Sequence, residues 1–153
     1  VRPMDIVAGD ASTRIEGADR YETAANIARE FGEVDTVYIA SGVTFPDALT
    51  ARSAPDVNAA LRSTSGFTRT DAPTLLTRPD SLPDATAAAL TELAPSEIYI
   101  IGGPAAVSEG VAAELAGFGA TVERIGGADR YETSALVAAG FPDNLPVVFV
   151  ATG

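Results

Sequence analysis

One stretch of this chain occurs twice, and it limits the possible folds more than any other feature. Residues 14–23, which read Arg-Ile-Glu-Gly-Ala-Asp-Arg-Tyr-Glu-Thr, return 110 positions later at residues 124–133. The similarity continues into a strand-like run, Val37–Gly42, which returns as Val148–Gly153. A spacing of this length is the size of a small domain and is too long for a solenoid unit. The chain therefore contains one module and the start of a second.

Composition argues against several classes of function. The formal net charge of −11 disfavours nucleic acid or an anionic membrane as a partner. The absence of cysteine and histidine removes thiol catalysis, Ser-His-Asp catalysis and metal sites built on these residues, and no cofactor is expected. No segment is apolar enough to span a bilayer. All ten basic residues are arginine, which suits phosphate and carboxylate, although a GC-rich coding sequence explains the missing lysine equally well.

Short β-branched runs alternate with alanine-rich helical patterns, which predicts an α/β fold with a mostly parallel sheet flanked by helices. The runs are almost continuously hydrophobic, as is typical of strands covered on both faces. Residues 52–70 are expected to form an irregular surface excursion. The expected strands lie near Thr36–Ala40, Thr74–Thr77, Glu97–Ile101, Thr121–Ile125, Val147–Ala151 and, least regularly, Thr13–Glu16.

Both copies of the repeat carry a helix start. Asp19 and Asp129 each stand three residues before a glutamate, which is the spacing of a capping box. Ser81 is expected to cap a further helix with Pro83 in its first turn. Because capping explains these acids, a glycosidase pair of Asp19 and Glu22 is disfavoured. The first helix is expected to bury one apolar stripe, formed by Ala24, Ile27, Ala28 and Phe31.

Arg20 and Arg130 are the first candidates for ligand binding, because each directly follows a helix cap. A cation there faces the positive end of the helix dipole, at a cost of roughly 0.3–1 kcal/mol. One explanation is a fixed ion pair with an acid such as Asp47 or Glu16. The other is display at the carboxyl edge of the sheet, where open α/β folds bind ligands.

Further candidates fall at the same expected edge. Tyr21 and Tyr131 suit stacking on a sugar ring, although packing on the adjoining helix is favoured. The pair Gly102-Gly103 follows a strand, where backbone amides can hold an anion, but a tight turn with positive φ is favoured. The remaining candidates are Arg14, Arg124, Ser41 and Gly42.

These motifs together resemble the cell wall-binding repeat type 2 family. The match runs from about Arg14 to Gly153, nearly the whole chain, and it rests on five ordered segments: Arg14–Ala24, Ala40–Gly42, Phe45–Leu49, Leu75–Thr77 and Tyr99–Ser108. It implies a Toprim-like fold without Toprim chemistry, since no Asp-x-Asp is present for magnesium.

The resemblance also implies a location and a partner. Modules of this family lie extracellularly at the cell wall of Gram-positive bacteria, usually in tandem and beside a separate functional domain. They provide S-layer-like, non-covalent anchoring to an anionic secondary cell-wall polymer, and they pack as a three-fold assembly. Here this implies a homotrimer or tandem packing.

Two departures from the family pattern shape the expected domain organisation. Residues 52–70 resemble an insertion, and the second copy stops before a Phe-Pro-Asp motif. We therefore expect a lead-in over residues 1–13, one complete module over 14–123, and the start of a second repeat over 124–153. This last part would complete the fold or exchange with a neighbour, and the chain would be a trimmed form.

The sequence favours a non-catalytic module in which arginine forks bind an anionic cell-wall glycopolymer. Because the whole chain is acidic, such a site must be a local positive patch, or a divalent cation must bridge it. Two alternatives stay open, namely a wall hydrolase or sugar-modifying enzyme, and a purely structural oligomerisation module.

Overall fold

The computed structural model describes residues 14–43 and 72–140. Within these ranges the chain forms alternating helices and strands. In chain order they are α1 (Arg20–Arg29), β1 (Thr36–Ser41), β2 (Thr74–Thr77), α4 (Asp84–Leu93), β3 (Glu97–Ile101), α5 (Glu109–Ala116), β4 (Thr121–Ile125) and α6 (Arg130–Ala138).

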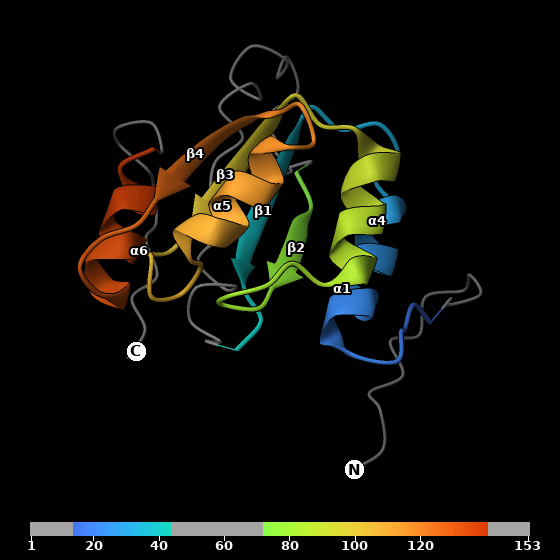
Figure 1. Cartoon of the computed structure of the whole chain (residues 1–153), viewed down its shortest axis with the longest axis horizontal. Coiled ribbons are helices and arrows are strands. Elements are labelled where there is room, and N and C mark those ends of the chain that lie inside the picture. The colour runs from blue at the N-terminus through green and yellow to red at the C-terminus, as the bar shows by residue number, and fades with distance from the viewer. Residues whose placement is uncertain (1–13, 44–71, 141–153) are drawn as a thin grey trace, which may run out of the picture.

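The four strands form one parallel sheet in the order β2-β1-β3-β4 (Figure 1). On β1, Ile39 stands opposite Leu75 of β2 on one side and Ile100 of β3 on the other. On the other side of β3, Ile101 stands opposite Ile125 of β4, the last described strand in the sheet order. Because all strands run in the same direction, their carboxyl ends meet at one edge of the sheet.

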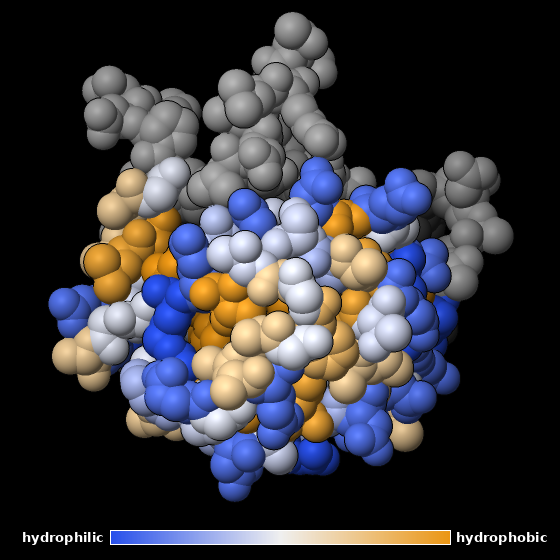
Figure 2. Space-filling model, turned by 45° about the horizontal axis from the view of Figure 1, so that its top comes forward, coloured by the Kyte–Doolittle hydropathy of each residue, from blue (hydrophilic) through white to orange (hydrophobic). Residues whose placement is uncertain are grey.

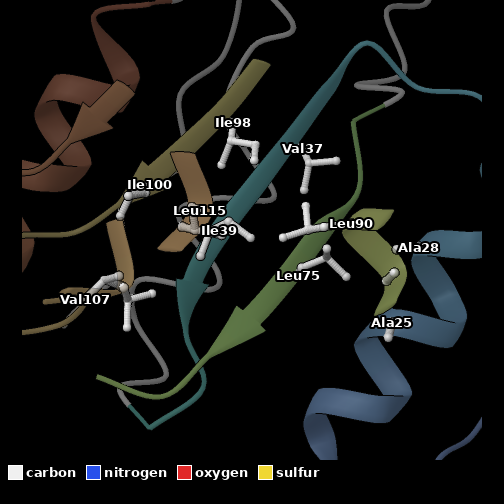
Figure 3. Close-up of a cluster of buried hydrophobic side chains, with 12 residues drawn as sticks. Ala25, Ala28, Val37, Ile39, Leu75, Leu90, Ile98, Ile100, Val107 and Leu115 are labelled. Carbon is white, nitrogen blue, oxygen red and sulfur yellow. The ribbon is translucent and has the colours of Figure 1, made fainter. Parts of the chain in front are cut away.

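One face of the sheet is covered by α1, α4 and α5 and holds the larger core (Figure 3). The buried side chains alternate along the strands, so every second residue points to this layer. Fully burying each large aliphatic side chain stabilises the fold by about 1.5–3 kcal/mol. The sheet contributes Val37, Ile39, Leu75, Ile98 and Ile100, and the helices and the loop before α5 contribute Ala25, Ala28, Ala89, Leu90, Val107, Val111 and Leu115.

The opposite face carries a smaller cluster, to which α6 contributes Val137. Tyr38 and Tyr99 lie side by side on this face, with ring centroids 5.9 Å apart and planes tilted by 38°. Ile101 is completely buried beside them. The expectation of strands covered on both faces is confirmed for β1, which is buried along its whole length, but not for β4, whose residues are exposed or half-buried. The α/β class is confirmed. The Toprim-like name stays a prediction.

The predicted strands agree closely with the structure. Thr74–Thr77, Glu97–Ile101 and Thr121–Ile125 are confirmed to the residue, and β1 is one residue longer than predicted. The strand expected near Thr13–Glu16 is wrong for its described part, because residues 14–16 are not in the sheet. The strand expected at Val147–Ala151 and the excursion at 52–70 lie outside the described residues.

The apolar stripe predicted for α1 is partly wrong. Ile27 is 44 % exposed, and Tyr21 and Ala25 are buried in its place beside Ala28. A helix in which apolar residues recur every three or four positions has several overlapping apolar stripes. Packing of α1 against α4 and β2 decides which of these stripes is buried.

The two aspartate caps are confirmed, whereas the predicted cap of α4 is wrong. Asp19 accepts from the amides of Tyr21 and Glu22, and Asp129 accepts from the equivalent amides of α6. The glutamate of each motif accepts from the amide one residue before the cap, whereas in a capping box it accepts from the amide of the cap itself. In α4 the N-cap is Pro83, which offers no side-chain hydrogen bond. Ser81 lies in the preceding turn, where its carbonyl oxygen accepts from the Arg78 amide and the Thr77 hydroxyl.

β4 crosses the expected end of the first module at residue 123. Its last two residues, Arg124 and Ile125, belong to the second copy of the motif but pair with β3 of the first. α6, also from the second copy, packs on β4. The expected division into 14–123 and 124–153 stays a prediction, but the sheet takes material from both parts.

Hydrophobic residues reach the outer surface in patches bordered by hydrophilic ones (Figure 2). Such patches are ordinary, since more than half of a protein surface is apolar. No helix in the described ranges is long and apolar enough to cross a membrane. The large hydrophobic side chains exposed in these ranges are Ile15, Ile27, Val43, Tyr131 and Leu136.

An ion pair joins α1 to α4 and gives a pH-dependent contribution to stability. Arg29 donates from Nε and Nη2 to the two carboxylate oxygens of Glu92, at 2.5 and 3.0 Å. The hydrogen bond lowers the pKa of Glu92 from its usual 4.5. The unfolded chain therefore binds more protons than the folded one in acid, so the contribution is complete above pH 4.5 and is lost as the pH falls through the lowered pKa.

We expect Glu92→Gln to lower the melting temperature slightly at pH 7 and to leave it unchanged once the pH is below the lowered pKa of Glu92. The effect at pH 7 is small because the pair is partly exposed and screened by solvent. Thermal unfolding followed by circular dichroism across this range measures it, with the exposed Glu114→Gln on α5 as a control. An equal effect of Glu92→Gln in acid and at neutral pH would contradict the assignment.

Candidate functional site

The carboxyl edge of the sheet gathers most of the candidate residues. β1 ends at Ser41, β2 at Thr77, β3 at Ile101 and β4 at Ile125, and a glycine or arginine follows each of them. Loops that follow parallel strands lie together at this edge, which is where open α/β sheets bind ligands.

Arg20 is held at this edge by the loop after β1. Its Nη1 donates to the carbonyl oxygen of Gly42 at 2.5 Å, and the residue is exposed. Among the described residues no acid pairs with Arg20. Glu16, one of the acids considered, pairs instead with Arg14 at 2.7 Å. Asp47, the other, lies outside the described residues. The Gly42 carbonyl thus fixes one nitrogen of the guanidinium while the exposed group retains donors for a ligand.

Tyr21, which follows Arg20 in the chain, contacts a second arginine that the sequence analysis missed. The guanidinium carbon of Arg78 stands 4.9 Å from the centre of the Tyr21 ring, within range of a cation–π contact. Tyr21 is 8 % exposed, so it packs, as was favoured. Arg78 is exposed and directly follows β2. Its place after a predicted strand was the signal that could have identified it. We call Arg20, Tyr21 and Arg78 the β1–β2 cluster.

Ser41 and Gly42 lie at the end of β1, where Gly42 contacts this cluster. Both are buried, and the Gly42 amide donates to the carbonyl oxygen of Thr77 at 2.8 Å. A Cβ atom at Gly42 would lie 2.6 Å from Cε1 of Tyr21, so the ring occupies the space a side chain would need. These two residues therefore position the cluster and are not themselves displayed to a ligand.

The Gly102-Gly103 turn is occupied by the protein's own groups. Gly102 has φ +115°, as the favoured turn required. Its amide donates to the Ile125 carbonyl at 2.9 Å, so it is not available to hold an anion. Its carbonyl accepts from Arg124 Nη1 at 3.0 Å, and Arg124 Nη2 lies 3.2 Å from Glu109. Arg124 thus ties together β4, the turn and α5, and its side chain is only 20 % exposed.

Arg130, Tyr131 and Arg14 are exposed and lie apart from the β1–β2 cluster. Arg130 and Tyr131 begin α6, which packs on β4, whereas α1 packs on β2 and α4. Tyr131 is 64 % exposed, so the packing favoured for both tyrosines occurs only at Tyr21. Arg130 has no ion-pair or hydrogen-bond partner among the described residues. The structure therefore places Arg20 and Arg130 near opposite edges of the sheet and does not bring them together.

The described residues contain no group of three or more acids, histidines or cysteines that could hold a metal ion. Asp19 and Glu22 are committed to the cap of α1, where Glu22 accepts from the Ala18 amide. What the edge offers is guanidinium donors beside an aromatic ring, a combination suited to phosphate or carboxylate carried on a sugar.

A comparison with known protein families settles the membership. The model of the cell wall binding domain 2 family matches residues 14–112. The chain belongs to this family. As a cell wall binding domain it is placed outside the cell, at the wall, as expected from its motifs. The residues matched include α1, all of β1–β3 and the β1–β2 cluster.

This cell wall binding domain is similar to parts of longer proteins from Bacillus subtilis and Clostridium difficile. It is 32 % identical over 86 % of its length to the N-acetylmuramoyl-L-alanine amidase LytC of Bacillus subtilis, and 34 % identical over 82 % to the amidase enhancer of the same species. Cwp6 from Clostridium difficile has a similar structure, with a TM-score of 0.68, 34 % identity and 82 % of this chain covered. The chain spans only 24, 15 and 18 % of these three proteins.

Proposed function

We propose that this domain is a non-catalytic anchor that holds a larger surface protein on an anionic secondary polymer of the cell wall, either teichoic-acid-like or an acidic polysaccharide. The β1–β2 cluster carries the proposal, because it displays Arg20 at the Gly42 carbonyl and Arg78 over the ring of the packed Tyr21. Charge-assisted hydrogen bonds from guanidinium groups to phosphate or carboxylate are about twice as strong as neutral ones.

A local concentration of arginine is needed because the chain as a whole is acidic. With a net charge of −11 it repels a polyanion at long range. Arg20 and Arg78 lie close to the start of α1, whose dipole favours an anion, while the amides of Tyr21 and Glu22 are already bound by the Asp19 cap. Arg130 stands at the equivalent position of α6 and would supply a second contact, while Arg14 is a peripheral contributor. Two weak sites along one polymer raise the overall avidity.

Two other functions are distinguishable from anchoring. A wall hydrolase or sugar-modifying enzyme would release fragments from purified walls, but the acids of the repeat motif serve as helix caps. A structural oligomerisation module would associate without binding walls. The homotrimer or tandem packing expected of the family is compatible with anchoring and is tested by equilibrium sedimentation.

Removal of the anionic polymer is the direct test. We expect the domain to co-sediment with purified walls, and to lose most of this retention after the polymers are chemically extracted while peptidoglycan stays intact. Retention is also expected to fall as salt rises, because exposed charge contacts are screened over about 10 Å at 0.1 M salt. A chelator added in parallel separates direct binding from a bridging cation. Equal retention on extracted walls would refute the proposal.

A further inference from the structure

The two copies of the repeat motif stand in different surroundings. In the second copy, Ile125 belongs to β4 and packs in the cluster under α6. In the first copy its counterpart Ile15 is 38 % exposed and outside the sheet. The following helices differ in the same way, since Val137 is 3 % exposed and its counterpart Ile27 is 44 % exposed.

The first copy therefore displays the apolar anchors with which the second copy closes the sheet. If it docked on the β3 edge of another molecule, it would add a strand through Ile15 and a covering helix through Ile27. The contact would join unlike surfaces of two molecules, and such head-to-tail contacts either close into rings or propagate into open chains. A difference between the two copies must therefore keep the first copy from docking on the β3 edge.

Residues 14–23 and 124–133 differ at a single position, where Glu16 stands in the first copy and Gly126 in the second. A Cβ atom at Gly126 would lie 2.6 Å from the carbonyl carbon and oxygen of Gly102 and 2.8 Å from the Gly103 nitrogen. Real Cβ atoms essentially never come this close, and the opposing atoms are backbone.

The opposing backbone has little freedom to retreat. The Gly102 amide donates to Ile125 and its carbonyl accepts from Arg124, while the Gly103 carbonyl accepts from the Ala106 and Val107 amides. Moving the turn would break several of these hydrogen bonds. Any residue other than glycine at this point of the motif is therefore excluded by the turn.

We infer that Glu16 prevents the first copy of the motif from docking on the β3 edge, so that this edge accepts only a strand with glycine at the position of Gly126. Glu16 disfavours docking of a second copy of this chain, whereas Gly126 allows the chain's own β4 to pair with β3. In its exposed position Glu16 pairs with Arg14, so its carboxylate remains solvated.

Exchanging the two residues in the full chain tests this inference. We expect Gly126→Glu to lower the melting temperature while sedimentation velocity stays that of the wild type. The double variant Gly126→Glu/Glu16→Gly is expected to recover part of the melting temperature and to associate increasingly with concentration, because the first copy of one molecule now fits the β3 edge of another. The control is Gly126→Glu/Glu16→Ala, which removes the carboxylate but keeps a Cβ, and is expected to behave like Gly126→Glu alone.

Three results would overturn the inference. They are an unchanged melting temperature for Gly126→Glu, no association of the Glu16→Gly double variant, and equal association of the Glu16→Ala control. If Gly126→Glu does not fold, Gly126→Ala is used in its place. Two labelled peptides of residues 14–31, one with Glu16 and one with Glu16→Gly, are then titrated with the Gly126→Ala protein. The Glu16→Gly peptide is expected to bind at least about fivefold more tightly, and equal affinities would likewise overturn the inference.

Discussion

The double variant Arg20→Ala/Arg78→Ala is expected to lose at least about tenfold in affinity for polymer-bearing walls, since a hydrogen bond to a charged group contributes about 1.5–3 kcal/mol. Both side chains are exposed at the carboxyl edge, so their loss removes donors without opening the core. Co-sedimentation with purified walls at several protein concentrations gives the affinity.

Arg29→Ala is the control for this loss. It removes one positive charge where the double variant removes two, and it does so in the last turn of α1, where the arginine pairs with Glu92. We expect it to retain wall binding at low salt. Adding Arg130→Ala to the double variant is expected to reduce the residual retention further. If the double variant and Arg29→Ala bound walls equally well, the carboxyl edge would not be the binding surface.

Leu115→Ala is expected to lower the free energy of unfolding by about 2–5 kcal/mol, which is the usual range for a fully buried leucine. Leu115 is completely buried in the layer between α5 and the sheet, next to Val107 and Val111. Its removal leaves a cavity in a layer held between rigid strands. Chemical denaturation at neutral pH measures the change.

Leu136→Ala supplies the control because this leucine is 46 % exposed on α6. It is expected to change stability by less than about 0.5 kcal/mol, as surface substitutions usually do. A loss at Leu136 as large as that at Leu115 would show that α6 contributes a second core of comparable weight. A negligible loss at Leu115 would contradict the core described for the first face.

The strands and caps were predictable because they depend on local patterns. Short runs with β-branched residues identified β2, β3 and β4 to the residue, and the Asp-to-Glu spacing identified the starts of α1 and α6. The exposed Ile27 was not predictable, since the pattern cannot say which of two overlapping apolar stripes meets α4. Such choices depend on contacts between elements far apart in the sequence.

The candidate site was predicted less completely than the fold. The sequence placed Arg20 at the same sheet edge as Gly42, and in the structure Arg20 donates to the Gly42 carbonyl. It treated Arg20 and Arg130 as one pair, although their helices pack against different strands. It missed Arg78, whose relation to Tyr21 exists only once β2 lies beside β1. Arg124 was ranked as a ligand contact, but its hydrogen bond and ion pair give it a structural role.

β4 takes its last two residues from the beginning of the next repeat, so the period of the sequence and the folding unit are out of phase. Protein cut at the motif boundary, after residue 123, would lose two of the five residues of β4 and all of α6. The edge of β3 would then be left without its full partner strand and prone to aggregate. Fragments for biochemical work should therefore end beyond Ala138, and a recombination event that adds or removes one 110-residue period leaves every sheet supplied with its closing strand.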